Sequence, residues 1–256
     1  MDSINNEVIQ LNREIKKIIS HSILMQFIDQ PNINEDMIAI LVKILRDANV
    51  DQKLVPHYIV AIMLMQIALN THEEVSNTEE TENAAQLRHR QLSILAGDYY
   101  SSMYYHILAK TEDIEFITIM SKGVQEINEA KVHLYMDKEA DEDSLVMYLC
   151  GIETILVKKT AEYFHFTEQR DLFIDFLLYK RLLAELENYR HNRTSNFIHA
   201  LQSIHTVENE TDDRQSDLLK HAITKVGERV ALSLTKFDPL DEVGKRIEES
   251  LATLKI

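Results

Sequence analysis

Glycine and proline are scarce in this chain: of 256 residues, only 5 are glycine and 3 are proline. Doubly wound α/β sheets need frequent glycine-rich turns, which five glycines cannot supply. Helix-forming residues dominate instead, and no run alternates apolar and polar residues with the period of two that a half-buried strand requires. The sequence therefore predicts an all-α fold, a helical bundle that forms a single domain over residues 1–256.

Cysteine and positive charge are also scarce. The one cysteine, Cys150, excludes an internal disulfide framework and fits a reducing compartment, and its apolar helical surroundings predict a buried, inert thiol. Lys and Arg number 27 against 42 Asp and Glu, which gives a net charge of −15. This negative charge argues against nucleic acid or anionic lipid as the main partner, because phosphate binding needs clustered Lys and Arg.

Long apolar runs are missing as well. The longest one, within residues 58–69, is too short to span a bilayer and is interrupted by Gln66. It is apolar on nearly every helical face, which predicts a buried helix at the centre of the bundle. The N-terminus lacks the pattern of a signal peptide, so we expect a cytoplasmic protein without a transmembrane segment.

The remaining pattern predicts helices separated by two polar loops, at residues 76–86 and 205–216. Asn34 and Thr167 are predicted to cap two of the helices. Residues 4–19 carry a narrow apolar stripe, which fits either a helix lying on its own core or a helix offered to another subunit. No internal repeat of 20–50 residues is visible, so a solenoid is not expected.

A short acidic block, His72-Glu73-Glu74, directly follows the buried helix. Carboxylate oxygens at a cavity mouth can hold Mg²⁺, but a helix end that meets solvent explains the block as well. Adjacent side chains on a helix point about 100° apart, so two neighbouring glutamates chelate one ion poorly. Four residues after Glu73 stands Asn77, whose neutral side chain is a weak cation ligand.

A second cluster lies on the helix predicted from Arg88 to Lys110. Gly97 interrupts this helix and predicts the close approach of another helix or of a ligand. Four tyrosines follow it with Met103 among them. They fit core packing, or the wall of an apolar tunnel.

These two clusters resemble the trans-polyprenyl diphosphate synthases. That family has a His-Asp-Asp-Val-x-Asp block after a buried helix, and then Leu-x-Gly-Asp-Phe/Tyr, here Leu95-Ala96-Gly97-Asp98-Tyr99. Lys159-Thr160-Ala161 is similar to a Lys-Thr-Ala that the family places later. The acidic block departs from the family pattern, since it reads Glu73-Glu74-Val75-Ser76-Asn77, and residues 180–187 contain no second aspartate-rich block.

The similarity is greatest to the small-subunit (component I) family of heteromeric heptaprenyl diphosphate synthases. Members share the Thr-His-x-Glu-Val block and a Leu-Ala-Gly-Asp-Tyr-Tyr-Ser helix that leads into Leu-Ala-Lys-Thr-Glu-Asp, here residues 108–113. The resemblance implies an isoprenoid synthase fold and a degenerate aspartate-rich motif without metal, formed by His72, Glu73, Glu74 and Asn77. It also implies residues that line a tunnel or an interface: Gly97, Asp98, Tyr99, Tyr100, Met103 and Tyr104. No residue of this chain is expected to be catalytic.

The resemblance further implies a non-catalytic or regulatory subunit that shapes the product tunnel of a large catalytic subunit. The pair would extend farnesyl diphosphate with isopentenyl diphosphate to heptaprenyl diphosphate for menaquinone, with Mg²⁺ on the catalytic subunit and no cofactor in this chain. The sequence does not decide whether the chain self-associates alone, although an unpaired apolar face would favour a homodimer in the partner's absence. The polyprenyl product implies transient membrane association. By analogy with the family's dimers, residues 88–135 are expected to form the interface. Two alternatives stay open: a purely structural helical adaptor, and an autonomous synthase that uses Glu73, Glu74 and Asp98.

Overall fold

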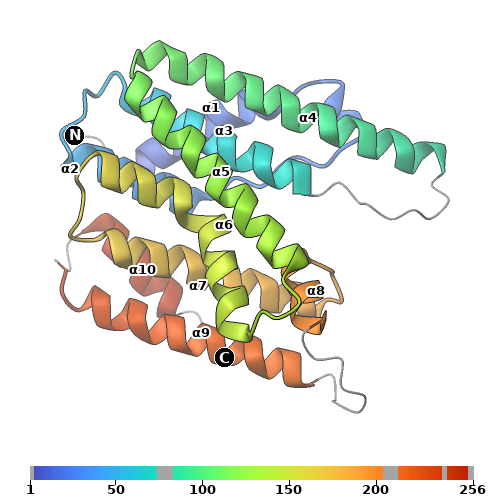
Figure 1. Cartoon of the computed structure of the whole chain (residues 1–256). Coiled ribbons are helices and arrows are strands. Elements are labelled where there is room, and N and C mark those ends of the chain that lie inside the picture. The colour runs from blue at the N-terminus through green and yellow to red at the C-terminus, as the bar shows by residue number, and fades with distance from the viewer. Residues whose placement is uncertain (1–2, 74–82, 204–212, 238–240, 253–256) are drawn as a thin grey trace. The chain divides into compact units, whose positions relative to one another are not determined.

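The computed structural model describes residues 3–73, 83–203, 213–237 and 241–252. Regular structure within these ranges consists of ten α-helices and two short 3-10 helices, with no strand among them (Figure 1). The prediction of an all-α fold is confirmed. The chain divides into two compact units, Met1–Thr118 and Ile119–Ile256, so the predicted single domain stays a prediction. We describe each unit by itself.

Unit 1 contains the N-terminal helices and the start of α5. In chain order they are α1 (Ile4–Ile19), η1 (Leu24–Gln26), α2 (Glu35–Asp47), α3 (Val55–Glu73), α4 (Ala84–Leu108), η2 (Ala109–Thr111) and α5 (Ile114–Met136), which continues into unit 2. None of the helices in the described part of the chain combines the length and the hydropathy needed to cross a lipid bilayer.

The first two helices begin at capping side chains and pack on each other. The Ser3 side chain accepts a hydrogen bond at the start of α1, and Asn34 Oδ1 accepts one from the Met37 amide at 3.0 Å, as predicted for Asn34. The apolar stripe of α1 is buried, and α1 contacts α2 and α3. Of the two explanations for this stripe, the structure supports a helix that lies on its own core.

Helix α3 is the buried centre of unit 1. Every residue from Tyr58 to Leu69 is buried, and α3 contacts α1, α2 and α4. The Tyr58 hydroxyl donates to Asp113 Oδ2 at 2.8 Å, just before α5 begins. Pro56 lies in the first turn of α3, where its missing N–H leaves no helical bond unmade. The predicted central helix is therefore confirmed.

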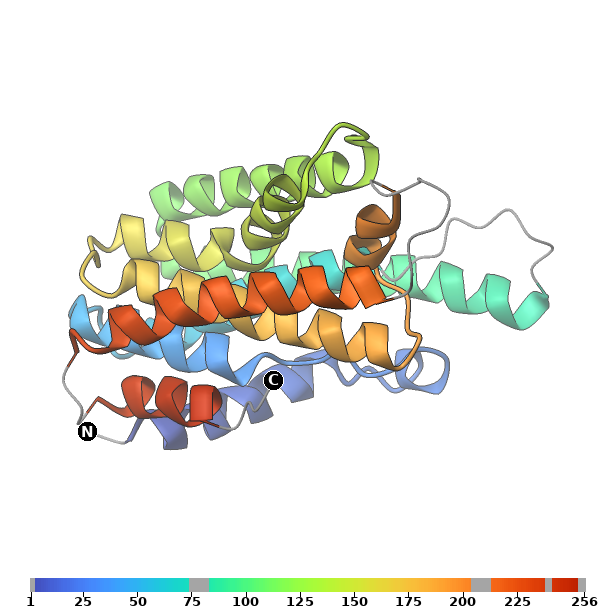
Figure 2. The ribbon, with the colours of Figure 1, turned by 90° about the horizontal axis from the view of Figure 1, so that it is seen from below.

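Helix α4 runs along α3, and its N-terminal turns extend past the end of α3 (Figures 1 and 2). Asn83 caps it in a reciprocal capping box with Gln86. Because the helix starts at Ala84, residues 84–86 of the predicted loop 76–86 are helical, and the residues of that loop before 83 lie outside the described ranges.

Unit 2 holds the rest of α5 and five further helices. These are α6 (Glu142–Tyr163), α7 (Arg170–Arg190), α8 (Asn196–Ser203), α9 (Asp213–Leu234) and α10 (Glu242–Ala252). Helix α7 contacts α6, α8 and α9, and α10 packs on α9 (Figure 2).

The helix boundaries of unit 2 correct two expectations. Helix α9 starts at Asp213, so residues 213–216 of the predicted loop 205–216 are helical, and residues 205–212 lie outside the described ranges. The predicted cap Thr167 is wrong, because α7 begins at Arg170 with Gln169 at the cap position and no side-chain capping bond.

Candidate functional site

The acidic block predicted after the central helix begins inside the last turn of α3. The Thr71 hydroxyl donates to the Ile67 carbonyl at 2.8 Å, and the helix ends at Glu73. His72 is exposed and Glu73 is partly exposed. Glu74 and Asn77 lie outside the described residues, so the structure places two of the four predicted motif residues.

His72 lies against Gly97 of α4. A Cβ atom added at Gly97 would come within 2.5 Å of the His72 ring. The same ring places Nε2 3.6 Å from Asp98 Oδ1. Glycine at position 97 therefore gives the imidazole room to lie on the α4 backbone beside Asp98, which explains the close approach that the sequence predicted. The structure brings His72, Gly97 and Asp98 together.

A metal centre needs more ligands than the described residues at this corner of unit 1 supply. Mg²⁺ and Ca²⁺ take six or more oxygen ligands, of which carboxylates supply the charge. Within the part of the chain that the structure describes, no group of three or more His, Cys, Asp or Glu side chains could hold a metal ion. Because Glu74 is outside that part, the expectation that this chain binds no metal stays a prediction.

The predicted tunnel residues point to different sides of α4. Gly97, Tyr100 and Tyr104 are buried, Tyr99 and Met103 are half-buried, and Asp98 is exposed. The Tyr100 hydroxyl donates to the Ile19 carbonyl at 3.3 Å, so this side chain fastens α4 to the end of α1. Asp98 therefore does not suit the apolar wall of a tunnel, and only the buried and half-buried members of the set remain candidates for it.

The rings of Tyr104 and its neighbour Tyr105 are in contact at the C-terminal end of α4, with centroids 4.3 Å apart and planes tilted by 36°. Burial, followed by a hydrogen bond with Tyr105, raises the pKa of Tyr104 far above its ordinary value. The phenol of Tyr104 therefore stays neutral at any physiological pH. It offers an apolar ring and no charge to its surroundings.

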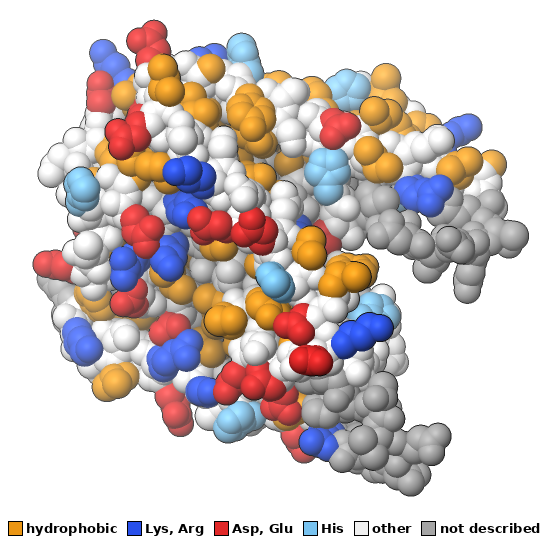
Figure 3. Space-filling view, viewed as in Figure 1, with side chains coloured by type: hydrophobic (Ala, Val, Ile, Leu, Met, Phe, Trp, Pro, Cys, Tyr) orange, Lys and Arg blue, Asp and Glu red, His pale blue; other side chains and the backbone are white. Residues whose placement is uncertain are grey.

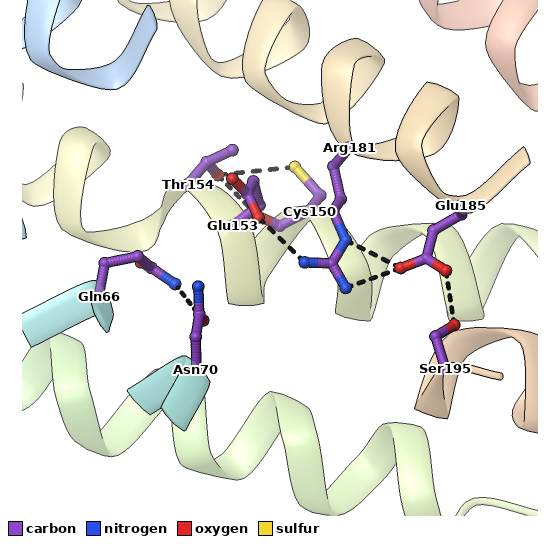
Figure 4. Close-up of polar contacts among 8 residues, drawn as sticks. All are labelled: Gln66, Asn70, Cys150, Glu153, Thr154, Arg181, Glu185 and Ser195. Atoms are coloured by element: carbon purple, nitrogen blue, oxygen red, sulfur yellow. Dashed lines mark hydrogen bonds and ion pairs between the residues drawn. The ribbon is translucent and has the colours of Figure 1, made fainter. Parts of the chain in front are cut away.

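Gln66 is the polar exception on the buried helix α3. Its Nε2 donates to Asn70 Oδ1 at 3.0 Å (Figure 4), while its buried Oε1 has no hydrogen-bond partner among the described residues. A buried acceptor without a donor costs roughly 1–3 kcal/mol. The interruption seen in the sequence is therefore an energetically unfavourable position of the core.

Unit 2 contains a buried ionic network that sequence reasoning missed (Figure 4). Arg181 donates to Glu185 Oε1 through Nε at 2.9 Å and through Nη2 at 2.7 Å. Glu185 Oε2 accepts from the Ser195 hydroxyl at 2.5 Å, and Arg181 Nη1 lies 3.6 Å from Glu153 Oε2. Because the Glu185 carboxylate is fully buried, it needs a cation and hydrogen-bond donors to offset the loss of water. The sequence contained one sign of this network, the i,i+4 spacing that places Arg181 and Glu185 on the same face of a helix.

The Lys159-Thr160-Ala161 stretch of α6 also makes its polar contacts within unit 2. Lys159 Nζ lies 2.6 Å from Glu126 Oε1 of α5, and the Thr160 hydroxyl donates to the Leu156 carbonyl at 2.7 Å. A Cβ atom at Gly123 would lie 3.2 Å from Lys159 Cδ, so the lysine stem packs on the α5 backbone. The ammonium group is therefore engaged by a carboxylate of its own unit.

Cys150 lies half-buried on α6. Burial raises the pKa of its thiol above the ordinary value, against the opposing effect of the Thr154 hydroxyl, which lies 3.7 Å from Sγ. A thiol held in its protonated form is a poor nucleophile, in agreement with the inert cysteine that the sequence predicted.

Comparison with known proteins decides the family. Residues 21–231 match the family model described as heptaprenyl diphosphate synthase (HEPPP synthase) subunit 1. The chain belongs to this family. Over 131 residues it is also 40% identical to heptaprenyl diphosphate synthase component 1 of Geobacillus stearothermophilus, a match that covers 51% of this chain and 57% of that relative.

Solved structures of polyprenyl synthases share the fold. The heptaprenyl diphosphate synthase of Staphylococcus aureus aligns with a TM-score of 0.69 and 12% identity, over 98% of this chain and 96% of that chain. The decaprenyl diphosphate synthase of Rhodobacter capsulatus aligns with a TM-score of 0.66 and 14% identity, over 96% of this chain and 95% of that chain. At such low identity these likenesses show the fold alone, and they confirm the predicted isoprenoid synthase fold.

The two regions that the resemblance compares with aspartate-rich motifs are each described within their own unit. The end of α3 carries His72 and Glu73. In unit 2, the Arg181 guanidinium binds Glu185 and lies near Glu153, so each of these carboxylates has a cation of its own unit beside it. The sequence pattern did not single out Arg181.

Proposed function

We propose that this chain is the non-catalytic, regulatory subunit of a heteromeric heptaprenyl diphosphate synthase. A large catalytic subunit would hold the Mg²⁺ and ionise the allylic diphosphate, and the two together would extend farnesyl diphosphate with isopentenyl diphosphate. The heptaprenyl product would serve menaquinone synthesis. We propose a cytoplasmic location, with transient membrane association through the product.

The observation that carries this proposal is the pairing of Arg181 with Glu185 in α7. Ionising an allylic diphosphate requires divalent metal to neutralise the charge that develops on the leaving group. Arg181 and Ser195 hold the two oxygens of the Glu185 carboxylate, and Lys159 is held by Glu126. The described residues of α7 thus support a helix that stabilises its own unit instead of binding metal.

We propose that this chain also extends the apolar wall along which the product grows. A long polyprenyl chain needs a long tunnel, and a partner subunit can lengthen it. Met103 and Tyr99 are the half-buried members of the predicted set, and Tyr104 stays neutral, so these side chains suit contact with hydrocarbon. Tyr100 is fully buried and bonded to α1, which favours a supporting role for that residue.

The test is a prenyl transfer assay with farnesyl diphosphate, isopentenyl diphosphate and Mg²⁺, run on this chain alone and with its large subunit. We expect activity only in the mixture, with a long product. Turnover by the isolated chain would contradict the proposal and would mean that Glu73, Glu74 or Asp98 binds metal. The Arg181→Met variant, assayed without the large subunit, tests the network: it should be less stable than the unaltered chain and should still show no turnover.

A purely structural adaptor is the alternative that the burial of Tyr100 favours. Met103→Ala separates the two functions, because Met103 is only half-buried and its loss should leave the subunit folded. A changed distribution of product lengths from the reconstituted pair supports tunnel shaping. An unchanged distribution together with a weaker complex supports the adaptor.

A further inference from the structure

A cavity of about 270 Å³ lies in unit 2 between α6 and α9, which both pack on α7. We call it the α6–α9 cavity. Its inner wall is apolar and comes from α7, α8 and α9. The side chains of this wall are at most 4% exposed: Leu178, Phe197, Leu201, Leu219 and Val226. A concave, mostly apolar space that several helices enclose is a common form of small-molecule site.

Helix α6 supplies the opposite wall of the cavity. Val146 and Cys150 are half-buried there, and Met147 is 61% exposed. Thiol and thioether sulfurs are polarisable, and a methionine side chain adapts its shape to an irregular apolar surface. This wall therefore suits contact with hydrocarbon.

The charged side chains at the cavity balance one another. Glu142 and Asp143 belong to α6, and Lys225 and Arg229 to α9. Lys225 Nζ lies 2.9 Å from Asp143 Oδ1, and Arg229 Nη2 lies 2.6 Å from Asp175 Oδ1 of α7. In the lower part of Figure 3, where α9 lies, acidic and basic side chains are likewise interspersed with hydrophobic ones. Because both cations already have a carboxylate beside them, an anionic head group would gain little here.

His221 of α9 also lines the cavity and can add one positive charge. When His221 is protonated, three cations face three carboxylates, since Asp175 joins the two of α6. When it is neutral, the carboxylates are in excess by one. In both states the cavity lacks the surplus of positive charge that would select an anion.

The ion pair of Lys225 and Asp143 limits what can enter. It joins residues 82 positions apart and connects α9 to α6, the two sides of the cavity. A helix of a partner protein is about 10 Å wide with its side chains, so it could not lie beneath this pair. Both side chains are more than half exposed, and exposed ion pairs are weak, so the pair can open for a small molecule.

The volume of the cavity indicates the size of its ligand. An apolar cavity of about 150 Å³ holds benzene, with its six carbons, so by proportion this cavity holds about ten carbons. We infer that the α6–α9 cavity binds a small, uncharged, hydrocarbon-rich molecule of about ten carbons, an isoprenoid or a linear alkyl chain that carries at most a hydroxyl group. The cavity would bind it whether or not this chain assembles with a large subunit.

The experiment uses Cys150 as a reporter, because it is the only cysteine of the chain and lines the cavity. Mass spectrometry measures the rate at which iodoacetamide alkylates the thiol at about pH 8.5, where its raised pKa still leaves some thiolate. Geraniol and 1-decanol, each at saturation, should slow the alkylation about fivefold or more, because the bound alcohol covers the thiol. Stronger protection by geraniol indicates an isoprenoid ligand, and stronger protection by decanol indicates a linear one.

Calorimetric titration then tests the charge and the place of the ligand. Geranyl diphosphate and decanoate should bind about fivefold or more weakly than the alcohols with the same carbon chains. Ala222→Phe should weaken binding of the alcohols about tenfold or more, because Ala222 is half-buried and the new ring fills the cavity. Ala231→Phe is the matched control, the same change at an exposed position of α9 outside the cavity, and should alter the affinity less than about twofold.

Three results would overturn the assignment of this cavity. The first is an alkylation rate that neither alcohol changes. The second is binding of the anionic molecules as tight as that of the alcohols, which contradicts an uncharged ligand. The third is equal weakening by Ala222→Phe and Ala231→Phe, which places the binding elsewhere. Far-UV circular dichroism confirms folding, and Val146→Phe, on the α6 wall, replaces Ala222→Phe if that variant unfolds.

Discussion

Helices α3 and α4 are neighbours in unit 1 and are both apolar on more than one face, yet only α3 is buried on all sides. In α3 the apolar side chains meet α1, α2 and α4. In α4 the inner side chains meet α3, while Leu87, Ile94, Leu95 and Tyr105 are exposed. An apolar helix in the centre needs no partner. An apolar helix at the edge of its unit leaves several of its apolar side chains in solvent.

The largest contrast should come from placing the same charge in each helix. Ile62 of α3 is fully buried and Leu95 of α4 is mostly exposed. Ile62→Asp should cost about 4 kcal/mol or more of the free energy of unfolding, because an unpaired carboxylate enters the core. Leu95→Asp should change it by less than about 0.5 kcal/mol. Urea denaturation followed by far-UV circular dichroism measures both. Equal losses would show that the outer face of α4 is already covered in the isolated chain.

The contact between the two helices can be broken at Gly97. Gly97→Ala should lower the free energy of unfolding by less than about 1 kcal/mol, because the new methyl group overlaps the far end of the exposed His72 side chain, which has to move aside. In a His72→Ala background the same change should raise it by up to about 1 kcal/mol, through the better helix propensity of alanine. A double-mutant cycle by urea denaturation gives the coupling. Additive effects would mean that His72 does not rest on Gly97 in solution.

The next prediction concerns Gln66, the buried polar residue of α3. Gln66→Leu should raise the free energy of unfolding by about 1 kcal/mol, since it removes a buried acceptor that has no donor among the described residues. Asn70 is only partly buried, so water can replace the lost bond. Asn70→Ala is the control. It should not raise the free energy of unfolding, because it leaves Gln66 Oε1 buried and without a donor. A loss of stability in Gln66→Leu would reveal a donor to Gln66 Oε1.

Within α4, the smallest effect should be a pH dependence at Tyr104. Burial raises the pKa of the Tyr104 phenol in the folded chain above its unfolded value of about 10. The stabilisation by neutral Tyr104 is therefore complete below that pH and decreases as the pH rises toward the folded pKa. Urea midpoints taken from about pH 9 to about pH 11 should fall more steeply for the unaltered chain than for Tyr104→Phe. Parallel slopes would contradict the shift.

Periodicity predicted much of this fold because burial in a helix follows local sequence spacing. The all-apolar run at residues 58–69 gave the buried helix α3, and Asn34 gave the start of α2. The cap at Thr167 failed, because capping depends on where the preceding turn ends, and α7 starts three residues later at Arg170. The short helix α8 was missed because eight residues carry too little periodicity.

The site was less predictable than the fold, since its contacts join residues far apart in the sequence. Gly97 pointed to a close approach, but only the structure shows that His72 is the group that approaches. Asp98 was grouped with Tyr100 by its position in a motif, although successive helical residues face different ways. The partners of Glu185 come from two places in the chain, Arg181 and Ser195, and only the first has a helical spacing that the sequence reveals.

The hydrogen bond from Tyr100 to the Ile19 carbonyl joins residues 81 positions apart, and this has a consequence for the order of folding. Helix α1 can pack on α2 and α3 as soon as those helices exist. The Ile19 carbonyl has to wait for Tyr100, which a ribosome adding roughly 5–20 residues per second reaches about 4–16 s after Ile19. The end of α1 is therefore bonded only after Tyr100 has been made, by the same helix whose Gly97 contacts His72.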